Sequence, residues 1–109
     1  MKIRGVPFRR IDWNAIEAET MPGETAAARV KSVMAGDIQS RVVSYESDYC
    51  ADHWCEKGHI LFMIDGELIL EFKNGEAVTL RAGQGFQVGD DGEPHRVRTE
   101  CAATAFIVD

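Results

Sequence analysis

The sequence lacks any long hydrophobic run. A membrane-spanning helix needs about eighteen or more consecutive, predominantly apolar residues, and no such stretch occurs among the 109 residues. Basic residues stand near the N-terminus, but no apolar stretch follows them, so the pattern predicts no secretory signal. We therefore expect a cytoplasmic protein that does not interact with a membrane.

Cysteine is also scarce. The chain has 3 cysteines, an odd number, and disulfide frameworks are rare in a reducing compartment. We expect Cys50, Cys55 and Cys101 to be free thiols, which either pack as small apolar groups or take part in chemistry. This argues against a small scaffold held together by disulfides.

Positive charge is in the minority. The 12 lysines and arginines stand against 18 acidic residues, for a formal net charge of −6. A negative field repels a phosphate backbone, so we expect no nucleic-acid partner. The one basic cluster consists of Lys2, Arg4, Arg9 and Arg10. Such a cluster can contact an anion, although a solvated edge is its commoner role.

The length and composition suit one small globular domain. Apolar residues make up 45% and charged residues 28% of the chain, and there is no repeat or linker. We expect residues 1–25 to form an irregular or helical N-terminal segment and residues 26–109 to form the β-rich body. Within the first segment, Asp12 is placed to cap a helical turn over residues 13–19.

From about residue 26 the chain has the pattern of successive strands. Leu68, Leu70 and Phe72 alternate with polar positions, and Asn74-Gly75 is the pair that most readily forms a tight hairpin turn. Val78 and Leu80 then continue the buried face. The predicted strands are residues 29–34, 38–46, 67–72, 78–80, 86–88, 95–99 and 103–108. Many short strands with glycine-rich turns predict an all-β protein, a sandwich or barrel of about six to eight strands.

The three histidines carry the strongest functional signal. His53 and Cys55 are two residues apart and share one face of an extended segment, and Gly58 permits a bend before His59. His95 shares a face with Val97, opposite two arginines, which points it inward. Adjacent residues of a strand face opposite sides, so Asp52 is a poor partner for His53.

Imidazole and thiolate groups are ligands of Zn²⁺, Fe²⁺, Ni²⁺ and copper ions. We therefore expect His53, Cys55, His59 and His95 to form a metal site inside the barrel, with Cys55 either a fourth ligand or a packed thiol. The alternative is a set of unrelated polar residues, each satisfied by its own core hydrogen bond. Nearby Tyr45 and Tyr49 can offer a phenol to a bound molecule, although aromatics at a barrel rim are commoner.

Two motifs resemble those of the cupin superfamily. His53-x-Cys55-xxx-His59-x6-Gly66 is similar to the first cupin motif, His-x-His-xxx-Glu-x6-Gly, and residues 83–95, from Gly83-Gln-Gly85 to Pro94-His95, resemble the second. Asp52-His53-Trp54-Cys55 resembles more narrowly the DHCW-motif cupins. The resemblance implies a single-domain jelly-roll β-barrel, a bound divalent transition metal and a homodimer. The chain departs from the general motif by having Cys55 and His59 where histidine and glutamate are usual.

Several functions are compatible with these features. One is a metal-dependent enzyme of the oxygenase or Lewis-acid type that acts on a small apolar or thiol-bearing molecule. Another is a non-catalytic binding module or sensor for a small ligand, and a third is a structural barrel without metal. Exposed strand edges and the apolar N-terminal residues Val6, Phe8, Ile11 and Trp13 need cover, so we expect a homodimer.

Overall fold

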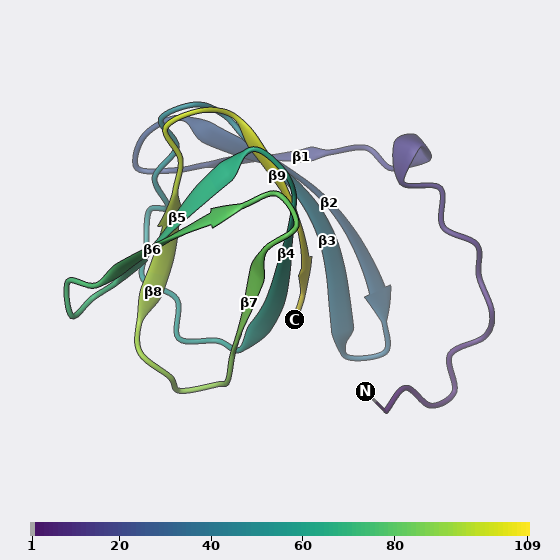
Figure 1. The fold of residues 1–109 in the computed structure, drawn as a ribbon. Coiled ribbons are helices and arrows are strands. Elements are labelled where there is room, and N and C mark those ends of the chain that lie inside the picture. The colour runs from purple at the N-terminus through teal and green to yellow at the C-terminus, as the bar shows by residue number, and fades with distance from the viewer. Residues whose placement is uncertain (1) are drawn as a thin grey trace.

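Two antiparallel sheets face each other in the computed structural model, which describes residues 2–109 (Figure 1). The larger sheet has the order β1 (Glu19–Pro22), β2 (Ala27–Ala35), β3 (Ile38–Tyr45), β9 (Ala103–Val108), β4 (His59–Asp65) and β7 (Gly85–Val88). The smaller sheet has the order β6 (Ala77–Arg81), β5 (Glu67–Phe72) and β8 (His95–Arg98). The predicted all-β class is therefore confirmed.

The strands number nine in the described residues, more than the six to eight expected. Two of the nine lie outside the predicted ranges: β4, which follows Gly58, and β1, in the N-terminal segment. Asp12 does cap a turn, since its Oδ1 accepts a hydrogen bond from the Asn14 N–H at 3.1 Å, but the 3₁₀ turn η1 ends at Ala15. The expected helical turn over residues 13–19 is thus shorter than predicted: residues 16–18 are in neither a helix nor a strand, and β1 then adds an antiparallel edge strand to β2. Its last residue is Pro22, which an edge strand tolerates.

The predicted hairpin is present between β5 and β6. Gly75 has a φ of 101°, which is the left-handed region that favours glycine, and Leu68 pairs with Leu80. Leu68 and Leu80 are buried, as expected, but Val78 is 46% exposed. The expectation for Val78 was wrong: Val78 lies on β6, the edge strand of the smaller sheet, whereas its partner Leu70 on the central strand β5 is buried.

The core fills the space between the two sheets. Met63 on β4 and Leu68 on β5 are the largest fully buried side chains, and they come from opposite sheets. The core cluster consists of Ala28, Val43, Tyr45, Tyr49, Leu61, Met63, Leu68, Leu80, Ala103, Ala105 and Ile107. These residues alternate with exposed ones along β4 and with half-buried ones along β9, as two packed sheets require.

The structure also describes the three cysteines and the segment before η1. All three cysteines are free; Cys50 and Cys55 are half-buried, whereas Cys101 is exposed. Among residues 2–109, no helix has the length and apolar character needed to cross a membrane. The chain before η1 runs outside both sheets (Figure 1).

Candidate metal centre

Three of the four residues expected to bind a metal lie together between the two sheets. Cys55, His59 and His95 each offer a ligand atom, and these atoms all lie within 4.8 Å of one another. The Nε2 atoms of His59 and His95 are 3.0 Å apart. This cluster could hold a metal ion.

The backbone explains why residues distant in the sequence meet here. Cys55 and His95 form an antiparallel bridge, in which the Cys55 N–H donates to the His95 carbonyl at 2.7 Å and the His95 N–H donates to the Cys55 carbonyl at 3.0 Å. His95 begins β8 in the smaller sheet, and His59 begins β4 in the larger sheet. The cluster therefore joins the two sheets at one end of the barrel.

Gly58 brings His59 to this place. A Cβ atom on Gly58 would lie 2.9 Å from the Val88 carbonyl oxygen and from the backbone of residues 89 and 90, which leaves no room for a side chain. The Gly58 N–H also donates to Asp90 Oδ1 at 2.7 Å. The predicted bend at Gly58 is thus a close approach of two backbones, which sets the start of β4.

His95 presents a lone pair to the cluster. Its side chain is buried, and its Nδ1 lies 3.0 Å from the Glu93 carbonyl oxygen. A carbonyl can only accept, so Nδ1 carries the proton and Nε2 keeps its lone pair. Metal-binding histidines are commonly oriented by such a second hydrogen bond.

His59 is also neutral, as a metal-binding imidazole must be. Its burial, and then the neighbouring His95, lower the pKa of His59, so the imidazole is neutral at pH 7. Its Nδ1 is buried without a hydrogen-bond partner among the described residues. Two imidazoles and a thiolate are a donor set that fits a divalent transition metal, and three protein ligands leave a position open.

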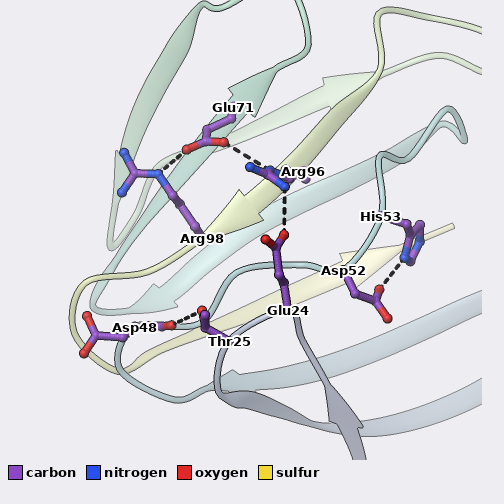
Figure 2. Close-up of polar contacts among 8 residues, drawn as sticks. All are labelled: Glu24, Thr25, Asp48, Asp52, His53, Glu71, Arg96 and Arg98. Atoms are coloured by element: carbon purple, nitrogen blue, oxygen red, sulfur yellow. Dashed lines mark hydrogen bonds and ion pairs between the residues drawn. The ribbon is translucent and has the colours of Figure 1, made fainter.

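The structure does not bring His53 into the cluster. Its side chain is 73% exposed, and its Nδ1 lies 2.7 Å from Asp52 Oδ1 (Figure 2). The expectation that Asp52 could not pair with His53 was wrong, because residues 52 and 53 lie in a bend and not in a strand. The hydrogen bond from His53 lowers the pKa of Asp52. His53 nevertheless lines the same cavity as the cluster.

That cavity has a volume of about 150 Å³ and extends from the cluster into the barrel. Tyr45 and Tyr49 line it, with their rings 5.1 Å apart, and both side chains are buried. They therefore lie inside the barrel and not at its rim. Burial raises the pKa of both phenols, so both hydroxyls stay protonated at pH 7.

Arg41 is a cavity residue that the sequence analysis missed. It lines the cavity from β3, where Arg41, Val43 and Tyr45 occupy alternate positions. This alternation is the sequence pattern that could have identified Arg41 as facing the cavity. The Arg41 guanidinium forms an ion pair with Asp109, with Nη2 and Oδ2 2.9 Å apart.

An ion-pair network supports the wall that carries His95. Glu71 on β5 bonds to Arg96, at 3.2 Å, and to Arg98 of the neighbouring β8, and Arg96 also reaches Glu24 at 3.3 Å (Figure 2). The Arg96 guanidinium lies 4.4 Å from the centre of the Trp54 ring. Trp54 thus lies against an arginine of its own chain.

Comparisons with known proteins identify the fold. Neither the models of known protein families nor the curated proteins give a match to this chain. Among solved structures, a predicted oxalate decarboxylase from Thermotoga maritima is 13% identical, with a TM-score of 0.78 over 92% of this chain and 96% of that one. The polyketide cyclase RemF from Streptomyces resistomycificus is 17% identical, with a TM-score of 0.76 over 94% and 78% of the two chains.

A third match is a domain of a regulator. The Cupin_2 domain of an XRE-family transcriptional regulator from Enterobacter cloacae is 18% identical, with a TM-score of 0.62 over 74% of this chain and 93% of that one. Identities this low show the fold and not the function. Together with the two facing sheets and the cluster at one end of the barrel, they show that this chain has the cupin fold.

Proposed function

We propose that this protein binds a divalent transition metal and is an enzyme of the oxygenase or Lewis-acid type that acts on a small molecule. The observation that carries the proposal is the convergence of Cys55 Sγ and the Nε2 atoms of His59 and His95 beside a cavity. When bound there, zinc, iron, nickel or copper would polarise a carbonyl or water, or activate dioxygen if the metal is redox-active. The chain itself orients His95 through Glu93 and excludes water with the apolar barrel wall.

We also propose that His53 is the fourth ligand. Asp52 accepts a hydrogen bond at Nδ1 of His53, so Nε2 keeps its lone pair. The side chain is exposed at the cavity that the cluster borders, and in the described residues its one hydrogen bond is to Asp52. A rotation of this side chain toward the cluster would complete a four-ligand shell.

A non-catalytic binding module or sensor is the second candidate. The supporting observation is that no aspartate or glutamate lines the cavity within the described residues, so a separate carboxylate for acid–base catalysis is missing there. The solved structures with this fold include both enzymes and a domain of a transcriptional regulator.

We also propose that the chain belongs to the narrower DHCW-motif group, which rests on residues 52–55. A cytoplasmic location is likewise a proposal, and the three free thiols support it.

We propose in addition that the protein is a homodimer. A compact monomer of 12.1 kDa exposes about 6,000 Å², whereas this chain exposes 7186 Å². The excess of roughly 1,200 Å² is more than the about 800 Å² that each partner buries in a standard interface. The exposed apolar residues Ile60, Phe62 and Ile64 occupy alternate positions on the outer face of β4.

The properties of the N-terminal segment favour another copy of this chain, rather than a different protein, as the partner. Val6 and Ile11 are partly exposed and Phe8 is 96% exposed, and the segment runs outside both sheets. Residues 2–11 carry four basic and no acidic side chains in a chain of net charge −6. A basic apolar arm on an acidic body is complementary to the acidic body of another copy.

Metal content of the purified protein tests the proposed function. We expect one divalent metal per chain under reducing conditions, and a loss of at least about tenfold in affinity for His59→Ala or His95→Ala, because the remaining ligands cannot restore the geometry. His53→Ala should weaken binding if it is the fourth ligand. Stoichiometric binding that both His59→Ala and His95→Ala leave unchanged would place the metal elsewhere and refute the proposal.

A further inference from the structure

The segment that leads to the thiol of the cluster leaves β8 and then returns to it. The Ala51 N–H donates to the Val97 carbonyl at 3.1 Å, and Cys55 then exchanges two hydrogen bonds with His95. Between these bonded positions the segment has three residues, 52–54, whereas β8 has a single one. Extra residues on one side of a ladder are left unpaired and bend away from the partner strand. Residues 52–54 therefore form a bulge beside β8.

The 52–54 bulge has few contacts with the barrel. Among residues 2–109, none of its backbone groups bonds to another backbone group, and Asp52 and His53 are exposed and bond to each other (Figure 2). Trp54 is different, because its half-buried ring has the Arg96 guanidinium 4.4 Å from its centre. A cation this close to the face of a tryptophan ring is attracted to it. This stack ties the bulge to β8.

Arg96 is itself fixed by two carboxylates. Its Nε donates to Glu71 of the neighbouring strand at 3.2 Å, and its Nη1 donates to Glu24 at 3.3 Å (Figure 2). The side chain is 23% exposed. A guanidinium held by its planar fork loses little further side-chain freedom when a ring stacks on its face. Trp54 thus packs against a surface that is already in place.

The position of the bulge matters because Cys55 follows it directly. The Cys55 thiol has only a weak contact of its own, 3.9 Å from the Lys57 carbonyl oxygen. The direction of the thiol therefore depends on the backbone bridge between Cys55 and His95. A ligand set loses its function when its supporting contacts let it move by about an ångström.

We propose that Trp54 and Arg96 form a clamp that keeps the 52–54 bulge on β8 and so positions Cys55 in the cluster. Neither residue is a proposed ligand, and both act through Cys55. The proposal deepens the proposed function, on which it rests for the metal that the clamped thiol would bind. The effect of the clamp on the bridge between Cys55 and His95 is measurable without metal.

Hydrogen exchange of single amides, followed by nuclear magnetic resonance in chelator-treated protein, tests the clamp. Trp54→Leu should speed exchange of the Cys55 and His95 amides by roughly three- to thirtyfold, the range that one cation–π contact supplies. Trp54→Phe keeps a ring over the guanidinium and should preserve more of the protection. The amides of β9 should exchange as in the wild type, because the opening is local.

The second tryptophan is a matched control. Trp13 is also half-buried, and its ring centre lies 6.1 Å from that of Phe106 on β9. Trp13→Leu removes a ring of the same size from the chain but not from the bulge. It should leave exchange of the Cys55 and His95 amides unchanged.

The arginines provide a second matched pair. Arg96→Met should act like Trp54→Leu, and the double variant should exceed neither change alone, because both remove the same contact. Arg98→Met removes the other arginine that bonds to Glu71 and leaves the stack in place. Its effect on the bridge amides should be less than about threefold.

Titration with Zn²⁺ connects the clamp to the site. Trp54→Leu should weaken Zn²⁺ binding at least about threefold, and Trp54→Phe should weaken it less. Bridge amides that respond to neither Trp54→Leu nor Arg96→Met would overturn the proposal, and so would faster exchange with unchanged Zn²⁺ affinity. If the wild type binds no Zn²⁺ but the amides respond, the metal function fails and the clamp stands; if Zn²⁺ binds and the amides do not respond, the reverse holds.

Discussion

At the scale of single residues, the thiol of Cys55 has the largest influence on which metal the cluster prefers. Thiolate is a soft ligand that favours zinc, copper and iron, whereas the histidine that the general cupin motif has at this position offers nitrogen. Cys55 is half-buried beside two imidazoles, and Cys101 is exposed and does not belong to the cluster. The two thiols therefore provide a test residue and a matched control.

We predict that Cys55 binds the metal as a thiolate. Cobalt-loaded protein should show a sulfur-to-cobalt charge-transfer absorption in the near ultraviolet, since such a band requires a metal–thiolate bond. Cys55→Ser should abolish the band and lower metal affinity, and Cys101→Ser should keep both. A band that persists in Cys55→Ser would show that Cys55 is only packed near the metal.

At the scale of elements, the start of β4 controls the position of His59. The backbone of Gly58 touches residues 88–90 so closely that any side chain would push the two segments apart. Gly89 offers a comparison, because a Cβ atom there meets nothing within 4 Å. Replacing each glycine by alanine therefore separates the effect of the close backbone contact at Gly58 from the effect of replacing any glycine.

Gly58→Ala should therefore weaken metal binding without touching a ligand. We expect a loss of at least about tenfold in affinity, because a shift of His59 by an ångström or so breaks the convergence of the three ligand atoms. Gly89→Ala should bind the metal like the wild type. Isothermal titration with Zn²⁺ measures both, and equal affinities for the two variants would contradict this account of β4.

The stability of the strand pair β5–β8 depends on the half-buried carboxylate of Glu71. Burial alone would raise the pKa of Glu71, but hydrogen bonds from Arg98 and Arg96 lower it below the ordinary value. Because the folded pKa is depressed, the stabilisation is present above about pH 4.3, the ordinary carboxyl value, and is lost as the pH falls through the folded pKa.

Glu71→Gln should lower the free energy of unfolding by about 1–2 kcal/mol at pH 7, and the difference from the wild type should shrink as the pH falls below about 4. The control is Glu67→Gln. Its partner Arg81 is 74% exposed, so the change should cost less than about 1 kcal/mol. Urea unfolding at both pH values gives these quantities, and a Glu71→Gln difference independent of pH would rule out the ionised carboxylate as the cause.

At the scale of the whole molecule, the outer face of β4 and the N-terminal arm leave apolar surface uncovered. We predict that the protein sediments as a dimer of twice 12.1 kDa at micromolar concentration. Removal of residues 2–11, or Phe62→Ser, should shift it toward the monomer, because each removes part of the proposed interface. Val78→Ser changes an equally exposed residue of the other sheet and should have no effect. Sedimentation of the full chain as a monomer would refute the homodimer.

Much of this architecture follows from local sequence rules. Alternation with a period of two identifies the strands of residues 38–46 and 103–108, and Asn74-Gly75 determines the hairpin, because both depend only on near neighbours. The same alternation turns Cys55 and His95 inward. The sequence thus singles out three residues, Cys55, His59 and His95, that the structure brings together in one cluster.

Other features depend on contacts between distant segments. Residues 19–22 have no alternation that marks a strand, and they become β1 only because the free edge of β2 accepts them. Val78 has the pattern of a core residue, but it is exposed because β6 is the edge strand of its sheet. Whether an apolar residue is buried depends on what lies opposite, and local patterning does not contain that information.

The sequence by itself determined the all-β fold and the residue types of the site. The tertiary structure alone decided that Cys55 and His95 meet across a bridge, that His53 turns to Asp52, and that a cavity opens beside the cluster. The physical reason is that side-chain direction along a strand is a local property of the backbone. The convergence of side chains from two sheets depends on how those sheets pack.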